Sequence, residues 1–176
     1  MPVQVTVAGL TIDPNNNSPI IILKDQTGEK TLPIWIGLLE ATAIASELES
    51  IKFSRPMTHD LLRNVIRSFG GSVERVEVVD LRDNTFFALI HAMANGQPIT
   101  IDARPSDAIA LALRMKCPIF VQEKVFESAG RTEEKDQELV KSADEKGQEV
   151  VKTEEGRKWT EILEGLSPEN FGKYKM

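Results

Sequence analysis

Apolar residues alternate with polar or small residues along several stretches of the chain, and this period of two is typical of β-strands with one buried face. The first such stretch opens with Val3, Val5 and Val7. Together with the turn residues between the stretches, the pattern of apolar positions predicts seven strands, at residues 3–12, 19–24, 31–36, 72–81, 85–94, 97–103 and 118–122. Asn95-Gly96, between the fifth and the sixth stretch, predicts a tight hairpin.

Three other stretches have apolar residues three or four positions apart, which predicts amphipathic helices at residues 38–51, 58–69 and about 106–115. Thr58 is the predicted N-cap of the second helix, and Gly70-Gly71 is its predicted end. The core-facing side of that helix is predicted to be Leu61, Leu62, Val65, Ile66 and Phe69. The third helix is apolar nearly all round, so we expect it to be deeply buried. The predicted fold class is α+β, with mixed β-sheets of about seven strands and three helices.

The composition changes after residue 126, so residues 1–126 are predicted to form one domain. Residues 127–158 are charged and contain few large apolar residues, which predicts a linker with one or two solvated helices or partial disorder. Residues 159–176 regain apolar side chains. They predict a C-terminal helical extension that docks on the domain or on a partner.

Charge and composition narrow the class of protein. The net charge of −6 excludes a non-specific coat for DNA, which needs a basic surface. Arginines dominate the basic residues of the first 126 positions, and arginine suits bidentate contacts with phosphate or carboxylate, so a local basic face stays open. No apolar run approaches the ~20 residues of a membrane helix. The N-terminus has the pattern of a strand rather than of a signal peptide, so we expect a cytoplasmic protein without a membrane partner.

The single cysteine, Cys117, excludes an internal disulfide and a cysteine-cluster metal site, and its apolar setting predicts a buried structural thiol. Only two histidines are present, far apart in the sequence, which argues against zinc. Phosphate loops, glycine-rich dinucleotide motifs and nucleophile elbows are absent from the sequence, so no organic cofactor is expected.

Two six-residue segments stand out because charged groups precede an apolar helix in both. Residues 55–60 read Arg-Pro-Met-Thr-His-Asp, and residues 102–107 read Asp-Ala-Arg-Pro-Ser-Asp. A packed core needs none of these charges. Each segment predicts a helix N-terminus that carries titratable side chains, and such a terminus can hold an anion or an acid–base group.

Catalytic and phosphate-binding roles can be assigned within these segments. The predicted catalytic residues are His59, Asp60 and Asp107, with His59 as general acid or base. The predicted phosphate-binding residues are Arg55, Arg104 and Ser106. The structural alternatives stay open: Thr58 and Asp60 cap a helix that leaves His59 at the surface, or Arg104 and Asp107 form a buried ion pair with Ser106 as N-cap.

The predicted metal ligands are Asp102, Asp107 and Glu40, because Mg²⁺ and Mn²⁺ prefer carboxylates. Glu40 and Glu47 share one face of the first helix, which is equally the pattern of a solvated face. His91 is predicted to be hydrogen-bonded within the sheet. Trp35 is predicted to be a core or interface residue, with base stacking as the alternative.

Three segments resemble the bifunctional nuclease domain family, once catalogued as a domain of unknown function. They are Leu-Pro-Ile-Trp-Ile-Gly at 32–37, Arg-Pro-Met-Thr-His-Asp-Leu-Leu at 55–62, and Asp-Ala-Arg-Pro-Ser-Asp-Ala-Ile-Ala-Leu-Ala at 102–112. The similarity covers roughly residues 3–126 in order. It implies an α+β domain with mixed sheets, assembly as a homodimer or higher homo-oligomer, and nuclease activity on DNA and RNA.

The leading functional prediction is therefore hydrolysis of phosphodiester bonds in DNA or RNA, assisted by Mg²⁺ or Mn²⁺. The first alternative is a non-catalytic module that binds an anion or small ligand and regulates a partner. The second is a structural oligomer in which both motifs serve only as caps and ion pairs.

Overall fold

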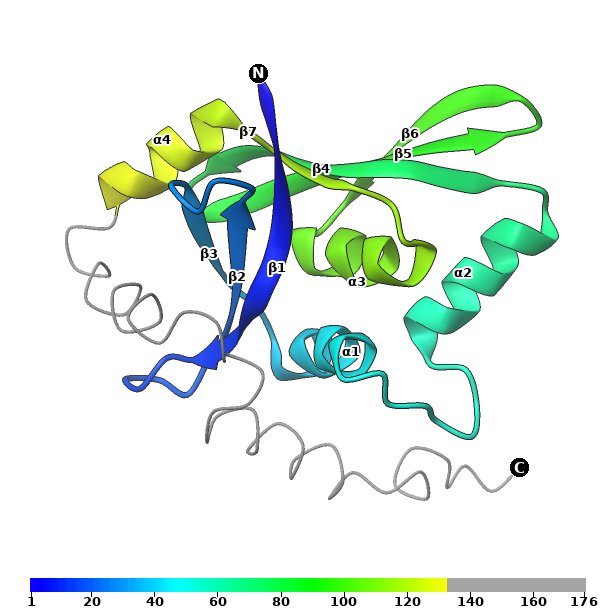
Figure 1. The fold of residues 1–176 in the computed structure, drawn as a ribbon, viewed down its shortest axis with the longest axis horizontal. Helices are drawn as coiled ribbons and strands as arrows, with labels where there is room; N and C mark the ends of the chain where they lie inside the picture. The colour runs from blue at the N-terminus through cyan, green and yellow to red at the C-terminus, as the bar shows by residue number, and fades with distance from the viewer. Residues whose placement is uncertain (133–176) are drawn as a thin grey trace.

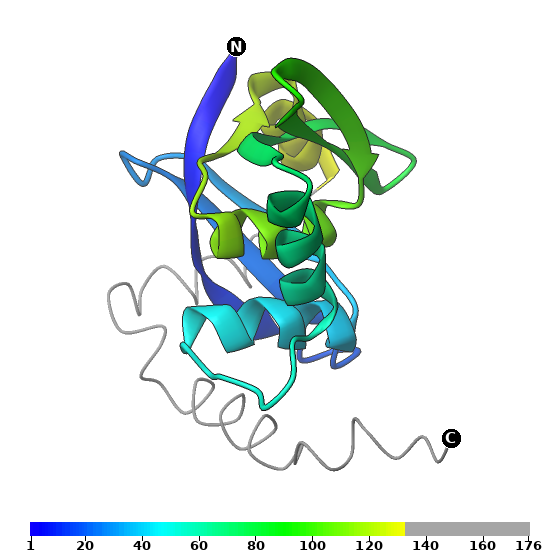
Figure 2. The same cartoon turned by 90° about the vertical axis from the view of Figure 1, so that its right-hand side faces the viewer.

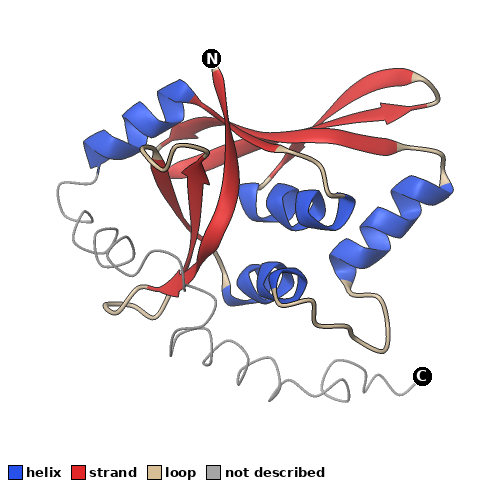
Figure 3. Cartoon of the chain, viewed as in Figure 1, coloured by secondary structure: helices blue, strands red, loops and turns tan. Residues whose placement is uncertain are grey.

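A computed structural model describes residues 1–132, so the predicted docking segment at 159–176 and most of the predicted linker lie outside the described residues. Seven strands and four helices make up this part of the chain, in the order β-β-β-α-α-β-β-β-α-β-α (Figure 3). The strands are β1 (Pro2–Ile12), β2 (Pro19–Asp25), β3 (Thr31–Trp35), β4 (Ser72–Arg82), β5 (Thr85–Ala94), β6 (Gln97–Ala103) and β7 (Ile119–Gln122). The helices are α1 (Leu38–Leu48), α2 (Thr58–Ser68), α3 (Pro105–Met115) and α4 (Glu123–Thr132).

The strands form one mixed sheet in the order β3-β2-β1-β7-β4-β5-β6. Within the described chain, β4 and β7 are its only parallel neighbours. The predicted hairpin at Asn95-Gly96 is confirmed, since both residues have positive φ, as a type I′ turn requires. Trp35, at the end of β3, and Asn84, in the β4–β5 turn, line the same pocket. The sheet therefore curves enough to bring the end of β3 close to this turn.

Helix α3 is the centre of the fold (Figures 1 and 2). It packs against β4 and β5, and α1 and α2 pack against it in turn. Six consecutive residues, 108–113, are apolar, and Ala108 to Ala112 are all buried in the core, as the all-round apolar pattern predicts. Among the described residues, no helix combines the length and apolarity needed to cross a bilayer.

Helix α4 was not predicted as part of the packed domain. Val125 and Ala129 lie four positions apart on it and are both buried against the core. A short helix can dock through only one such apolar pair. Because most of its other residues are charged or small, the sequence shows no clear apolar stripe here. The predicted domain end at residue 126 falls inside this helix.

The predicted burial of α2 is wrong for most of its apolar side. No residue of α2 is fully buried, and Leu61, Leu62, Val65 and Phe69 are exposed. Ile66 alone of the five predicted residues packs against the core. The helix touches α3 along one edge, so an amphipathic pattern here does not correspond to an interior face.

The two predicted helix caps are also corrected. Met57 is the N-cap position of α2, and the Asp60 carboxylate accepts a hydrogen bond from the Met57 backbone N–H at 3.1 Å, while Thr58 begins the helix proper. Arg104 is the N-cap position of α3, and Pro105 occupies its first turn. Ser106 is therefore inside the helix, because proline is favoured at the first helical position and shifts the start by one residue.

Candidate functional site

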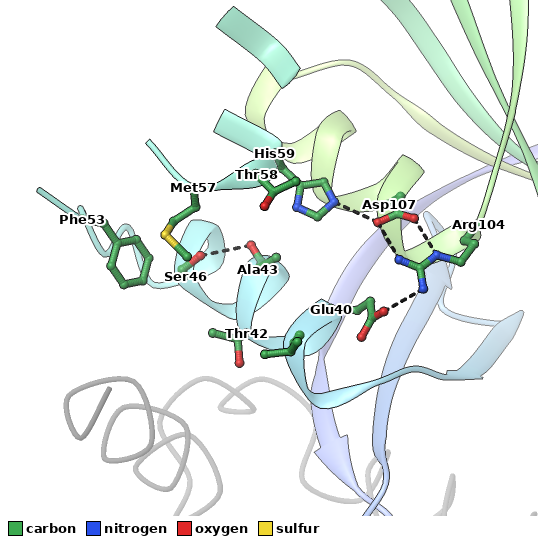
Figure 4. Close-up of a pocket in the computed structure, with 11 residues that line it drawn as sticks. Glu40, Thr42, Ala43, Ser46, Phe53, Met57, Thr58, His59, Arg104 and Asp107 are labelled. Atoms are coloured by element: carbon green, nitrogen blue, oxygen red, sulfur yellow. Dashed lines mark hydrogen bonds and ion pairs between the residues drawn. The ribbon is translucent and has the colours of Figure 1, made fainter. Parts of the chain in front are cut away.

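The first turns of α1, α2 and α3 meet at one place, and a charged or titratable side chain from each joins a single network (Figure 4). His59 Nε2 lies 3.0 Å from Asp107 Oδ1. Arg104 donates to Asp107 from Nε at 2.7 Å and from Nη2 at 3.2 Å, and to Glu40 from Nη1 at 2.8 Å. The tertiary structure thus links the two motifs, which lie more than forty positions apart in the sequence.

This network borders a cleft of about 370 Å³ between α1 and α2. Met57 and Phe53 form apolar parts of its wall, and Ser46 and Thr42 line it from α1. Charged groups at one end of a cleft with apolar walls are typical of ligand sites. The cleft therefore gives His59 and Arg104 access to a bound molecule.

Glu40 reaches Arg104 because Gly37 leaves room for it. Gly37 is the N-cap position of α1, and a Cβ atom there would overlap Glu40 Oε2. Its φ of −75° is ordinary for any residue, so space and not backbone conformation requires glycine. The absent side chain allows Glu40 to fold back over the helix start toward Arg104.

Asp107 is held ionised. Burial alone would raise the pKa of this carboxyl group, but the hydrogen bonds from Arg104 and His59 outweigh burial and lower its pKa below the usual value. An ionised carboxylate can only accept, so Nε2 of His59 carries the proton that points to Asp107. The other ring nitrogen, Nδ1, has no hydrogen-bond partner within residues 1–132, and in the neutral ring it carries the lone pair.

Arg104 is the cation of the site. Its hydrogen bonds and charge interaction with Asp107, and then those with Glu40, raise its pKa, so the guanidinium is always charged. Its side chain is 65% exposed, so the ion pair with Asp107 is not the buried pair of the structural alternative. An exposed guanidinium can exchange part of its carboxylate contact for phosphate.

Asp60 belongs to a separate, buried contact. Its Oδ1 accepts from Arg114 Nε at 2.8 Å and its Oδ2 from the Met57 backbone. Burial opposes ionisation, yet the bonds from Met57 and Arg114 leave the pKa of Asp60 lowered. One oxygen thus joins α2 to α3 and the other caps the start of α2, an arrangement that suits anchoring rather than proton transfer.

Arg55 lies in the loop before α2 and lines a neighbouring cleft of about 420 Å³ with Lys52 and Arg63. The acidic residues Glu47 and Asp60 border the same cleft. Phe53 lines both clefts, so the one around Arg55 adjoins the one around His59. The structure places Arg55 beside the His59–Asp107 pair rather than in contact with it.

The predicted metal ligands do not form one cluster. Asp102 is exposed on β6 and pairs in register with Leu89, on the face of the sheet opposite to Ala88 and Ile90, which are buried under α3. Glu40 and Asp107 converge, but Arg104 lies between them. Residues 1–132 hold no group of three or more His, Cys, Asp or Glu side chains arranged to share a metal ion.

The remaining residues singled out in the sequence have clear positions. The prediction for His91 is confirmed, since its Nε2 lies 3.2 Å from Glu77 Oε2 within the sheet. Trp35 donates its indole N–H to Asp13 at 3.2 Å. Cys117 packs against the core, and burial raises the pKa of its thiol. Ser106 is buried and lines a third pocket together with Arg104.

Arg114 is a functional candidate that the sequence reasoning missed. It is buried and donates to Asp60, to the Ala110 carbonyl and to Ser46 Oγ, so it ties α1, α2 and α3 together behind the site. The signal was present, because Arg114 is a charged residue at the end of the most apolar helix. A buried arginine requires partners, and the partners mark a junction.

Comparison of the sequence with known proteins identifies the family of the chain. The family model described as the bifunctional nuclease domain matches residues 21–134. The chain is 38% identical over 170 residues to a protein of Mycobacterium tuberculosis (strain ATCC 25618 / H37Rv) named "Uncharacterized protein Rv1829", a match that covers 96% of this chain and 97% of that protein.

Plant proteins give weaker matches over the domain. The chain is 28% identical over 126 residues to "Bifunctional nuclease 2" of Oryza sativa subsp. japonica and 28% identical over 116 residues to "Bifunctional nuclease 1" of Arabidopsis thaliana. These matches cover 69% and 64% of this chain, but only 39% and 36% of the plant proteins. The family model spans well over half of the residues of this chain, so the chain belongs to the bifunctional nuclease domain family.

Proposed function

We propose that the protein hydrolyses phosphodiester bonds in DNA or RNA in the cleft between α1 and α2. The observation that carries the proposal is the His59–Asp107 pair with Arg104 beside it at the end of that cleft. A histidine oriented by an ionised carboxylate is a common general base, and an adjacent arginine stabilises charge on phosphate. Membership of the nuclease family and the plant relatives named as bifunctional nucleases support the same reaction.

In the proposed reaction His59 Nδ1 accepts a proton from water as the water oxygen bonds to phosphorus. The bond from phosphorus to the leaving ester oxygen breaks, and that oxygen takes up a proton from solvent. Asp107 stays ionised and stabilises the imidazolium that forms, and Arg104 binds the negatively charged oxygens of the phosphate. Arg55, with Lys52 and Arg63 in the adjoining cleft, binds a neighbouring phosphate of the strand.

The sequence also predicts assistance by Mg²⁺ or Mn²⁺, and this stays a prediction. Glu40 and Asp107 are the carboxylates nearest the proposed reaction centre, and both contact Arg104. In the proposed reaction His59 moves the proton and Arg104 binds the phosphate, and neither step depends on a metal. Cleavage assays in Mg²⁺, in Mn²⁺ and in EDTA test the prediction directly.

The proposal is tested by cleavage of fluorescent single-stranded DNA and RNA by His59→Ala and His91→Ala proteins, purified in parallel with the original protein. His91 is the matched control, because it also pairs with a carboxylate but lies on the other face of the sheet. We expect His59→Ala to lose roughly 10²- to 10⁴-fold in rate and His91→Ala to retain activity. Equal activity of all three folded proteins would place the activity elsewhere or in a contaminant.

The alternative is an anion-binding module without catalysis. One observation favours it: both carboxylates near Arg104 are already satisfied, and no further acidic group joins them in the described part of the chain. In that case the protein binds phosphate-containing ligands, with Arg104 as a contact, but cleaves neither substrate under any metal condition.

The proposed assembly is a homodimer formed through one apolar surface. This surface, the α2–β6 surface, consists of the exposed residues Leu61, Val65, Phe69, Ile99 and Ile101. Both views place α2 and the β5–β6 hairpin on the same side of the molecule (Figures 1 and 2). β6 is also an edge strand, and an apolar edge invites pairing with an identical edge about a twofold axis.

A further inference from the structure

A pocket of about 260 Å³ opens at the first turn of α3, beside the cleft that holds His59. Residues of β3, the β4–β5 turn, α1 and α3 border it, among them Trp35, Asn84, Phe86 and Ser106. Glu40 and Arg104 line both this pocket and the cleft of His59. The two spaces are therefore neighbours with Arg104 between them.

Ser106 marks this pocket as a binding site. The residue is only 6% exposed, and its hydroxyl group has no hydrogen-bond partner among the described residues. Buried hydroxyl groups are nearly always paired, so an unpaired one that lines a pocket is available to a ligand atom or a water that enters it. A hydroxyl can donate to a phosphate oxygen as readily as to water.

The helix itself adds donors at the same place. α3 begins without a side-chain cap, so the backbone N–H groups of Ser106 and Asp107 have no acceptor from a capping side chain. The free N–H groups and the dipole of an eleven-residue helix favour an anion at this end. Arg104 adds a positive charge, which Glu40 and Asp107 offset.

Trp35 supplies an aromatic wall to the pocket. Its side chain is 36% exposed, and the hydrogen bond from its indole N–H to Asp13 holds the ring in place. An exposed aromatic ring beside a phosphate site is the usual platform for a nucleobase. Asn84 and Thr85, from the adjoining turn, add polar groups to the rim.

We infer that this pocket binds the nucleotide next to the scissile bond, with its phosphate at Ser106 and the α3 terminus and its base against Trp35. The inference rests on the proposed nuclease function, because it assigns one subsite of that substrate. Arg104 then contacts two successive phosphates of one strand. The pocket acts as a specificity determinant and not as a second reaction centre.

The test is calorimetric titration of the full chain with adenosine 5′-monophosphate and with inorganic phosphate. We expect the nucleotide to bind more tightly than phosphate, and Ser106→Ala to weaken both by roughly tenfold, the usual cost of losing a hydrogen bond to an anion. Trp35→Ala should reduce nucleotide binding to the level of phosphate, and Trp35→Phe should restore it. Ser72→Ala, an exposed serine at the start of β4, is the control.

Glu40→Gln gives a second, opposite prediction that does not depend on a buried substitution. It removes the negative charge beside Arg104, so both ligands should bind more tightly. Unchanged affinity in folded Ser106→Ala and Glu40→Gln, or no nucleotide binding at all, overturns the inference. Either result leaves the nuclease proposal standing if His59→Ala abolishes cleavage. Conversely, full cleavage by His59→Ala would refute the nuclease proposal and leave the binding measurements valid.

Discussion

At the scale of single residues, Arg104 is the group on which the site depends. One guanidinium reaches two carboxylates from different helices, and only a planar fork of five donors can do so while a second edge stays exposed. Lysine at this position would provide one charged point and could not hold Asp107 bidentately. The contact of Arg104 with Glu40 depends in turn on a residue without a side chain, Gly37.

Gly37→Ala tests this dependence. The added Cβ overlaps Glu40 Oε2 and should push Glu40 away from Arg104. We expect phosphate affinity to rise by roughly two- to fivefold, because an exposed ion pair of this kind is worth less than about 1 kcal/mol and its loss frees the guanidinium. Calorimetric titration with inorganic phosphate measures the effect. Gly130→Ala, where a Cβ meets open space, should leave the affinity unchanged.

Asp107 predicts a defined dependence of stability on pH. Its pKa is lower in the folded protein than the ordinary value of 3.8, so its ionisation stabilises the fold above that value. This stabilisation is lost as the pH falls through the lower folded-state pKa. In urea unfolding between pH 6 and pH 2, we therefore expect Asp107→Asn to show a shallower acid decline than the original protein. Asp102→Asn, at an exposed position outside the network, should follow the original curve.

At the scale of elements, three helix starts converge because α3 is buried between its neighbours. α3 presents Asp107 and Arg104 at one end and Arg114 at the other, and Arg114 fixes α1 and α2 against it. The second residue of α2 is His59, so the angle of α2 sets the distance between His59 and Asp107. The anchoring contact between Asp60 and Arg114 thus positions the proposed base from behind the cleft.

Arg114→Leu should be strongly destabilising. It leaves the Asp60 carboxylate without its charged partner at a largely buried junction, and breaking a buried ion pair costs roughly 3 kcal/mol or more. Urea unfolding at pH 7 measures the loss. Arg82→Leu, which breaks the short but exposed pair with Asp80, should have a much smaller effect. Similar losses in both variants would contradict an anchoring role for Arg114.

At the scale of the whole molecule, the α2–β6 surface exposes apolar side chains that a monomer has no reason to leave in water. Phe69 is 80% exposed, and its apolar neighbours on α2 also face outward. Large exposed apolar patches in folded proteins commonly mark interfaces. Because α2 also borders the cleft of His59, assembly through the α2–β6 surface should affect access to that cleft.

Val65→Glu places a charge in the centre of the α2–β6 surface, at an exposed position that the folded monomer tolerates. We expect light scattering after size exclusion to change from twice the 19.6 kDa chain mass to the single mass. Glu29→Lys, in the exposed β2–β3 turn, should leave the mass unchanged. A monomer before any substitution would refute the proposed dimer.

Local pattern determined much of this protein from the sequence alone. The local pattern of apolar and turn residues located all seven strands of the described chain, because the residues that mark a strand are neighbours in the sequence. The uniform apolarity of 108–113 predicted the buried helix, and Asn95-Gly96 predicted the hairpin between β5 and β6. The two motifs likewise contain three of the four side chains of the network, His59, Arg104 and Asp107, whereas Glu40 comes from the first predicted helix.

Tertiary structure alone decided which of those residues meet. Asp60 and His59 are adjacent in sequence, yet a helix turns successive side chains about 100° apart, so one faces Arg114 and the other faces Asp107. Asp102 precedes Arg104 by two positions, but β6 ends at Ala103 between them. Asp102 stays on the sheet face opposite to Ala88 and Ile90, whereas Arg104 turns with the chain into the start of α3. The burial of α4 and the exposure of α2 depend on which neighbour covers each helix, and periodicity carries no information about that neighbour.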